Sequence, residues 1–243
     1  MIMIPEAVEG HLSKIEQAAP EVVRAVHVVG SAALGDHNPA SSDLDLVVEL
    51  DRVPDTEDLL AIADAHGAGV DVDALYFLPG ELAKPWREAA TAWWAREGEL
   101  RDSRPTYQPD AVTWLQLATT AVTVRGDRPA SPADVPAARE ACRHTLHSYW
   151  QPLLAQAASM AQTTPVLLWT GLGMPRVWHT ARTGEIVSKT RGAELAGLVW
   201  PDLAAPLREL TAVRADRSIP VTEVHAAAVH EVGRRILGDM TDH

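Results

Sequence analysis

The feature that most constrains the fold is a pair of aspartates at the start of an otherwise apolar run. Asp43 and Asp45 open the segment DLDLVVEL, residues 43–50, whose valines and leucines predict a buried strand. Side chains two positions apart in a strand lie on one face, with Cα atoms about 6.6–7 Å apart. Burying two like charges side by side is costly unless a partner compensates them. The pair therefore predicts a bound divalent cation, and Mg²⁺ favours oxygen ligands together with substrate phosphates.

A Gly-Ser pair lies upstream of this strand. Gly30 and Ser31 end the apolar run AVHVV, residues 25–29, and the turn-rich segment HNPASS, residues 37–42, connects them to the aspartates. Glycine permits a close approach of the backbone, and serine offers a hydroxyl and an N–H to a phosphate oxygen. The order of strand, Gly-Ser, loop and Ser-Asp-Leu-Asp predicts a site for a nucleoside triphosphate and its metal.

A third carboxylate can come from the segment VDVDALYFL, residues 70–78, whose alternation predicts another strand. Asp71 and Asp73 lie on one face of this strand, because side chains alternate along it. Either of them could join the first pair and complete a metal cage. The residues themselves leave the choice between Asp71 and Asp73 open.

Hydrophobic periodicity predicts strands and helices in the first half of the chain and helices alone in the second. Besides the strands above, the predicted elements of the first half are helices over residues 6–19, 55–69 and 81–97, and a helix running into a short strand over 109–126.

The segment GDRPASPADVPA, residues 126–137, is rich in proline and alanine and is the best candidate for a linker. It places a domain boundary near residue 130, with one domain over residues 1–130 and another over residues 131–243. Beyond this boundary the strand signal fades, and we expect four or five helices. The layout is a small α/β half followed by a helical bundle.

Charge and cysteine content exclude several classes of function. The formal net charge of −12 leaves no basic excess to neutralise nucleic-acid phosphates. No run approaches the ~20 apolar residues of a membrane span, and the N-terminal MIMIPEAVEG lacks the basic start of a signal peptide. Cys142 is the only cysteine, so no intramolecular disulfide can form. We therefore expect a cytoplasmic protein with neither a nucleic-acid nor a membrane partner.

Several motifs together resemble a known enzyme family. The segment GSAALGDHNPASSDLDLVV, residues 30–48, resembles the signature of the polymerase-beta-like nucleotidyltransferase superfamily, G-S-x-x-x-G followed by [ST]-D-x-D. The segments AVTVRGDRP, residues 121–129, and RVWHTARTGEIVSK, residues 176–189, are similar to stretches of the aminoglycoside adenylyltransferases that modify streptomycin and spectinomycin. The resemblance covers nearly the whole chain. It implies an α+β fold, with an N-terminal nucleotidyltransferase mixed β-sheet and flanking helices, plus a C-terminal α-helical bundle.

The resemblance also implies that ATP is the AMP donor and that Mg²⁺ is the metal. Asp43 and Asp45 would hold Mg²⁺. Gly30, Ser31 and Ser42 fall where the family binds the triphosphate.

Three further roles follow from the same resemblance. Asp71 falls where the family has a carboxylate that acts as general base on the acceptor hydroxyl, and it would be the third metal-site carboxylate. Asp73 stays its rival. Arg176 and Lys189 fall where the family reaches the ATP phosphates from the helical domain.

The expected reaction is transfer of AMP from ATP to a hydroxyl of a small molecule, by a protein that we expect to be a monomer. The resemblance points to an aminoglycoside as acceptor and to antibiotic resistance. However, residues 141–184 contain no Asp or Glu, in the region where the family grips its polycationic substrates with acidic side chains. The alternatives are the same chemistry on a non-aminoglycoside small molecule or a protein, and a non-catalytic nucleotide-binding module.

Overall fold

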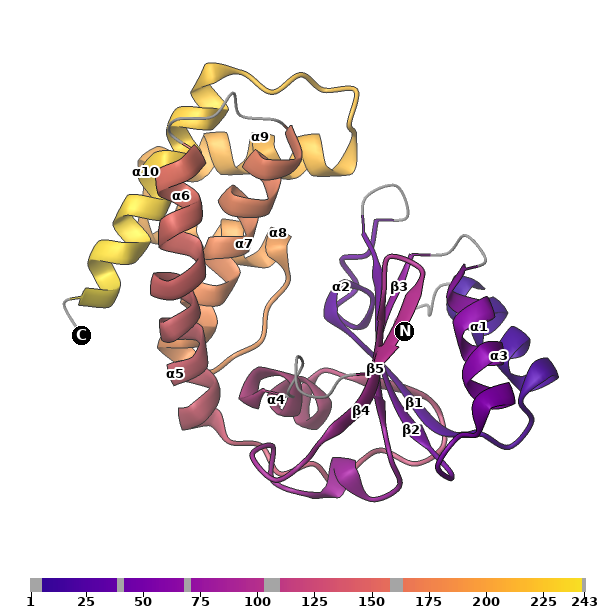
Figure 1. The fold of residues 1–243 in the computed structure, drawn as a ribbon. Coiled ribbons are helices and arrows are strands. Elements are labelled where there is room, and N and C mark those ends of the chain that lie inside the picture. The colour runs from indigo at the N-terminus through magenta and orange to yellow at the C-terminus, as the bar shows by residue number, and fades with distance from the viewer. Residues whose placement is uncertain (1–5, 39–41, 68–70, 103–109, 158–163, 242–243) are drawn as a thin grey trace. The chain divides into compact units, whose positions relative to one another are not determined.

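A computed structural model of the chain describes residues 6–38, 42–67, 71–102, 110–157 and 164–241. The chain divides into two compact units, Met1–Asp134 and Val135–His243. The first unit runs from indigo to magenta in Figure 1 and the second from rose to yellow. The division lies within the segment predicted as a linker, a few residues beyond the predicted boundary.

The first unit is built on a six-stranded sheet with the order β5-β4-β3-β2-β1-β6. Strands β2 and β3 are parallel, and the other neighbouring strands are antiparallel. The sheet is therefore mixed, which confirms the predicted α+β fold class. Its strands are β1 Val23–Val29, β2 Leu44–Leu50, β3 Val72–Phe77, β4 Thr91–Arg96, β5 Glu99–Asp102 and β6 Val122–Arg125.

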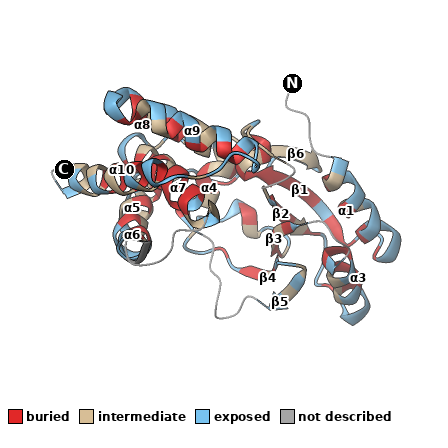
Figure 2. Cartoon of the chain, turned by 90° about the horizontal axis from the view of Figure 1, so that it is seen from above, coloured by how far each residue is buried: buried red, intermediate tan, exposed pale blue. Residues whose placement is uncertain are grey.

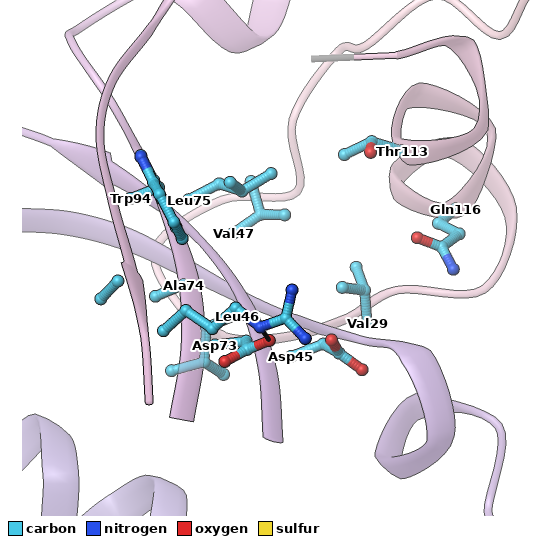
Figure 3. Close-up of a pocket in the computed structure, with 12 residues that line it drawn as sticks. Val29, Asp45, Leu46, Val47, Asp73, Ala74, Leu75, Trp94, Thr113 and Gln116 are labelled. Carbon is cyan, nitrogen blue, oxygen red and sulfur yellow. Dashed lines mark ion pairs between the residues drawn. The ribbon is translucent and has the colours of Figure 1, made fainter. Parts of the chain in front are cut away.

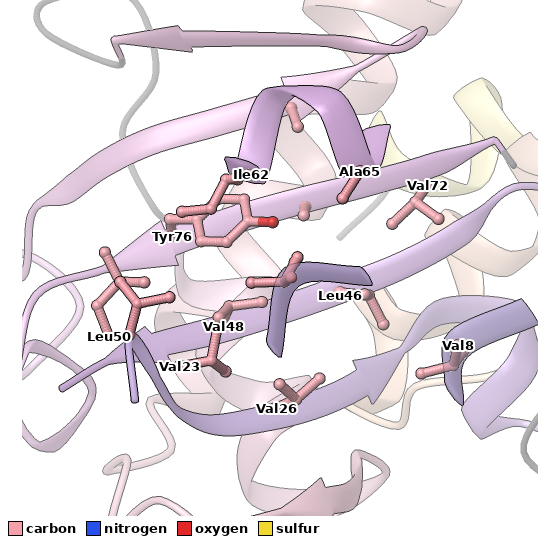
Figure 4. Packing of buried hydrophobic residues seen from close by; sticks show 14 of the residues in the cluster. Val8, Val23, Val26, Leu46, Val48, Leu50, Ile62, Ala65, Val72 and Tyr76 are labelled. Carbon is pink, nitrogen blue, oxygen red and sulfur yellow. The ribbon is translucent and has the colours of Figure 1, made fainter. Parts of the chain in front are cut away.

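Helices pack against both faces of this sheet (Figure 1). On one face, Val8 and Ile62 from two helices pack against Leu46 and Val48 of β2 (Figure 4). On the opposite face, a third helix packs against Val47 and its neighbours. Because both faces are covered, β2 reads as a nearly continuous apolar run. The helices of this unit are α1 Glu6–Ala18, α2 Gly30–Ala33, α3 Thr56–Gly67 and α4 Ala111–Thr119, with a 3₁₀ turn at Glu81–Ala83.

The prediction of a helix over residues 81–97 is wrong. After the 3₁₀ turn, the chain forms β4, which pairs with β3 on one side and with β5 on the other. The turn between β4 and β5 lies at Glu97 and Gly98, which both have positive φ angles. Alanine and glutamate favour a helix here, but pairing with two neighbouring strands outweighs that local preference. Strand β5 was not predicted.

The described part of the second unit contains helices and turns only, as predicted. Its long helix α7 packs against α5, α8, α9 and α10. Figure 2 shows that much of α7 is buried, while the outer sides of α8 and α10 are more exposed. The helices are α5 Val135–Thr145, a π-helical turn Leu146–Trp150, α6 Gln151–Ala157, α7 Thr164–Thr183, α8 Lys189–Val199, a 3₁₀ turn Pro201–Leu203, α9 Ala204–Ala215 and α10 Glu223–Thr241.

Within the described ranges, no helix combines the length and the apolar character that a membrane crossing needs.

Candidate active site

The parallel pairing of β2 with β3 brings aspartates from both strands together. Leu44 pairs with Val72, and both are buried in the core beneath α1 and α3. Asp45 pairs with Asp73 at the next position and therefore lies on the opposite face, towards α4. Asp43 comes directly before β2 and lies on the same face as Asp45. The strand register thus gathers three acidic side chains at one end of β2 and β3.

Asp43, Asp45 and Asp73 form a compact carboxylate cluster. Each offers one oxygen atom, and the three atoms lie within 4.8 Å of one another. Asp43 is exposed and the other two are half-buried. Partial burial, reinforced by the nearby Asp43 charge, raises the pKa of Asp73 to about 6. Three carboxylates within reach of one ion are a donor set that suits Mg²⁺, so these residues fit the implied metal.

Asp71, the third carboxylate of the sequence prediction, lies outside this cluster. It is exposed and comes directly before β3, where its carbonyl oxygen accepts a hydrogen bond of 3.0 Å from Leu44 N. The register pairs Asp73 with Asp45, while Asp71 lies directly before the first paired residues, Leu44 and Val72. Asp73 is therefore the third carboxylate of this cluster, and the role of Asp71 as metal ligand and general base stays a prediction.

Gly30 and Ser31 lie beside the cluster, at the turn from β1 into α2. Gly30 has a φ of +63°, and a Cβ atom built on it would lie only 1.9 Å from Asp45 Oδ2. Only glycine meets both requirements, since the conformation is left-handed and the space is already filled. The Oγ atom of Ser31 is buried and has no hydrogen-bond partner among the described residues. A buried hydroxyl without a protein partner fits contact with a ligand at this position.

Ser42 closes the loop that leads into β2. Its Oγ accepts a hydrogen bond of 3.2 Å from Asn38 N, and its own N–H donates to Asn38 O at 2.8 Å. These two bonds give Ser42 a structural role at the start of the strand. Its contact with the triphosphate stays a prediction, and residues 39–41 of the loop lie outside the described residues.

Asp45 and Asp73 line a pocket of about 270 Å³ between the sheet and α4 (Figure 3). Val47, Leu75 and Trp94 supply apolar surface, and Thr113 and Gln116 of α4 supply polar groups. This combination of apolar walls and a few polar groups suits a small organic molecule.

Arg96, at the end of β4, also lines this pocket. Its Nε lies 3.6 Å from Asp73 Oδ2. Sequence reasoning missed Arg96, because the helix predicted over residues 81–97 gave no reason to place it beside an aspartate. The strand-favouring threonine and tryptophans of TAWWAR, residues 91–96, were the signal that could have placed it.

Arg176 and Lys189 belong to the second unit, where helices α7 and α8 meet. A Cβ atom on Gly192 would lie 2.6 Å from Arg176 N, so the two helix backbones touch at this point. Lys189, at the start of α8, places its Nζ 4.6 Å from the centre of the Trp169 ring. The Trp169 indole N–H in turn donates a hydrogen bond of 3.0 Å to Tyr149 Oη. The contact of both cations with ATP stays a prediction.

Comparison with known proteins supports this interpretation of the first unit. Residues 8–89 match the family model of the nucleotidyltransferase domain. A search of curated proteins finds no match. Among solved structures, the chain is similar to the crystal structure of spectinomycin adenyltransferase AAD(9) from Enterococcus faecialis with ATP and spectinomycin, at a TM-score of 0.65 and 13% identity. That similarity covers 95% of this chain and 98% of the other. Residues 8–89 are therefore similar to a nucleotidyltransferase domain, and the chain has the fold of a spectinomycin adenylyltransferase, which confirms the resemblance at the level of fold.

Proposed function

We propose that the protein is an ATP- and Mg²⁺-dependent adenylyltransferase, which moves AMP from ATP to a hydroxyl of a small molecule and releases pyrophosphate. The observation that carries this proposal is the cluster of Asp43, Asp45 and Asp73 beside Gly30 and Ser31. It lies on the strands of a domain whose family transfers nucleotides. The structurally similar protein crystallised with ATP supports the choice of nucleotide.

The three aspartates would hold Mg²⁺, which when bound neutralises charge on the triphosphate and on the leaving group. Gly30 leaves the space that the Asp45 carboxylate occupies, so this side chain stays close to the turn into α2. The buried Ser31 hydroxyl is available to donate a hydrogen bond to a phosphate oxygen. Arg176 and Lys189 would add positive charge to the nucleotide from the second unit.

Asp73 is the residue best suited to act as general base. Its carboxylate lines the pocket, where one of its oxygens could accept a proton from the acceptor hydroxyl. The hydroxyl oxygen then attacks the α-phosphorus in line, its new P–O bond forms, and the bond to the β-phosphate oxygen breaks. Pyrophosphate leaves with the bonding electron pair. The pocket lined by Trp94 and Thr113 would receive part of the acceptor.

The acceptor is a small molecule, as the spectinomycin of the similar crystal structure suggests. Aminoglycosides are one class of candidates, and antibiotic resistance would follow from their modification. A second candidate is a less cationic hydroxyl compound, favoured by the absence of Asp and Glu from residues 141–184. An ammonium group that loses its water needs a carboxylate partner. We also propose that the enzyme is monomeric and cytoplasmic and that it has no nucleic-acid partner.

A screen of acceptors tests this function directly. The protein is incubated with ATP and Mg²⁺, and each candidate acceptor is examined by mass spectrometry for the addition of one AMP. Pyrophosphate release is followed in parallel, and calorimetric titration with ATP separates binding from turnover. We expect AMP addition to at least one small hydroxyl compound. Tight ATP binding without pyrophosphate release for any acceptor would instead identify a nucleotide-binding module.

A further inference from the structure

Arg96 makes an ion pair with one member of the carboxylate cluster. Its Nε lies 3.6 Å from Asp73 Oδ2, and both residues line the pocket. The side chain comes from the last residue of β4, the strand next to β3, and it is 60% exposed. Arg96 therefore reaches Asp73 from a neighbouring strand, while its own surroundings leave it room to move.

Arg96 and a metal ion compete for the same carboxylate. The three aspartates carry three negative charges, and Arg96 is the cation that the structure places against Asp73. A divalent ion bound between the aspartates would also need an oxygen of Asp73. Two cations that share one carboxylate repel each other, so the presence of Arg96 weakens binding of the metal.

A second acidic side chain can pair with Arg96 when its ion pair with Asp73 is broken. Its Nε also lies 3.7 Å from Glu97 Oε1, in the turn between β4 and β5. Glu97 directly follows Arg96 in the chain and has a φ of +53° in this turn. When a metal takes Asp73, the guanidinium thus retains an acidic neighbour instead of standing alone.

We propose that Arg96 is a positioning residue that holds Asp73 in the metal-free protein and lowers the affinity of the aspartate cluster for a divalent cation, so that metal binds together with the nucleotide. The triphosphate supplies the additional oxygen ligands that overcome this competition. The inference rests on the proposed function only in taking the cluster as a metal site. It requires neither an acceptor nor turnover.

The test measures Mn²⁺ binding by electron paramagnetic resonance, at about pH 8 and low salt, in the absence of nucleotide. Arg96→Gln should bind Mn²⁺ about two- to fivefold more tightly than the native protein, the range expected for a half-exposed ion pair. Arg96→Lys keeps the charge and should bind Mn²⁺ like the native protein. With the non-transferable analogue α,β-methylene-ATP present, the difference between Arg96→Gln and the native protein should shrink.

Arg101→Gln is the matched control. Arg101 lies on the adjacent strand β5, 5.3 Å from the centre of the Trp94 ring, and its Nε donates a hydrogen bond of 3.1 Å to Glu99. Because it is an arginine of the same hairpin with a different partner, its loss should leave Mn²⁺ affinity unchanged.

The melting temperature gives a second measurement, in case glutamine itself disturbs the site. Arg96→Gln and Arg96→Ala should both gain more stability from Mn²⁺ than the native protein does. A purely structural role for Arg96 would lower the melting temperature equally with and without metal.

The proposal is overturned if Arg96→Gln and Arg96→Ala both bind Mn²⁺ no more tightly than the native protein does. It is also overturned if Arg101→Gln gains as much Mn²⁺ affinity as Arg96→Gln. If neither the native protein nor any variant binds Mn²⁺, the cluster is not a metal site and the inference about Arg96 fails as well. If Mn²⁺ binds as expected but no acceptor receives AMP, only the proposed function fails.

Discussion

Titratable side chains lie on both faces of the sheet, and the two sets behave in opposite ways. On the face covered by α1 and α3, His11 and His66 of these helices are buried with ring centres 4.5 Å apart, and His66 Nε2 lies 2.8 Å from the hydroxyl of Tyr76. Burial lowers the pKa of both histidines, that of His66 to about 4. On the face towards α4, Asp45 and Asp73 keep contact with solvent and with other charges.

The difference separates a packing feature from a candidate site. The two histidines avoid the free-energy cost of a buried charge because they stay neutral, and their rings pack in the core. The aspartate cluster instead gathers three like charges, with Arg96 of β4 paired to Asp73, and two of its members line a pocket. A perturbed pKa therefore marks a candidate site here only where the charge is kept and a ligand can reach it.

Asp73 is the position at which a single substitution should reduce turnover most. Asp73→Asn should lower the rate of AMP transfer by about 10²–10⁴-fold, the usual cost of removing a positioned base. Asp71→Asn is the matched control, because Asp71 lies on the same segment but outside the cluster. Single-turnover rates with saturating ATP compare the two variants. A larger loss in Asp71→Asn would restore the original sequence assignment and remove Asp73 from the mechanism.

The two assignments show what sequence can and cannot supply here. Strands β2 and β3 and their four aspartates follow from local alternation, and the Gly30–Ser31 turn follows from its place after an apolar run. The choice of Asp73 over Asp71 depends on how two distant strands align, which local periodicity does not contain. Arg96 was missed for a related reason, since β4 forms by pairing with β3 and β5.

The histidine pair was not predicted either. His11, His66 and Tyr76 come from α1, α3 and β3, and only the packing of these three elements brings them together. Each residue alone gave no signal in the sequence.

The loss of folding stability at acid pH should come from the buried histidines of α1 and α3. A histidine whose pKa is about 6.5 in the unfolded chain and about 4 in the folded protein contributes stability above pH 6.5. That stability is lost as pH falls from about 6.5 to 4, because the unfolded chain then binds a proton that the folded protein excludes. The free energy of unfolding should fall by up to about 1.4 kcal/mol per pH unit from His66 alone.

His66→Gln isolates this contribution, since glutamine keeps a hydrogen-bonding group near Tyr76 but does not titrate. Urea unfolding at about pH 7 and pH 5 should show a smaller loss of stability in the variant than in the native protein. The raised pKa of Asp73 acts in the opposite sense in both proteins and cancels in the comparison. Identical pH dependence would mean that the buried ring does not control acid stability.

In the second unit, Lys189 and Arg182 each lie over a tryptophan ring. Lys189→Ala should weaken ATP binding by about 1.5–3 kcal/mol, the range for a hydrogen bond to a charged group. Arg182→Ala is the control, because Arg182 also pairs with Asp239 at the far end of α7. Calorimetric titration with ATP and Mg²⁺ measures both. Unchanged ATP affinity in Lys189→Ala would falsify the proposed contact with the nucleotide.

Asp43→Asn distinguishes a metal site from a structural ion cluster at the three aspartates. Asp43 is exposed, so its replacement should not disturb the core. We measure the melting temperature of the native protein and the variant in EDTA and in Mg²⁺–ATP. If the aspartates are metal ligands, the variant in EDTA should be as stable as the native protein or more stable, because one of three repelling charges is gone. Its stabilisation by Mg²⁺–ATP should be largely lost. A lower melting temperature in EDTA with undiminished stabilisation by Mg²⁺–ATP would contradict the account.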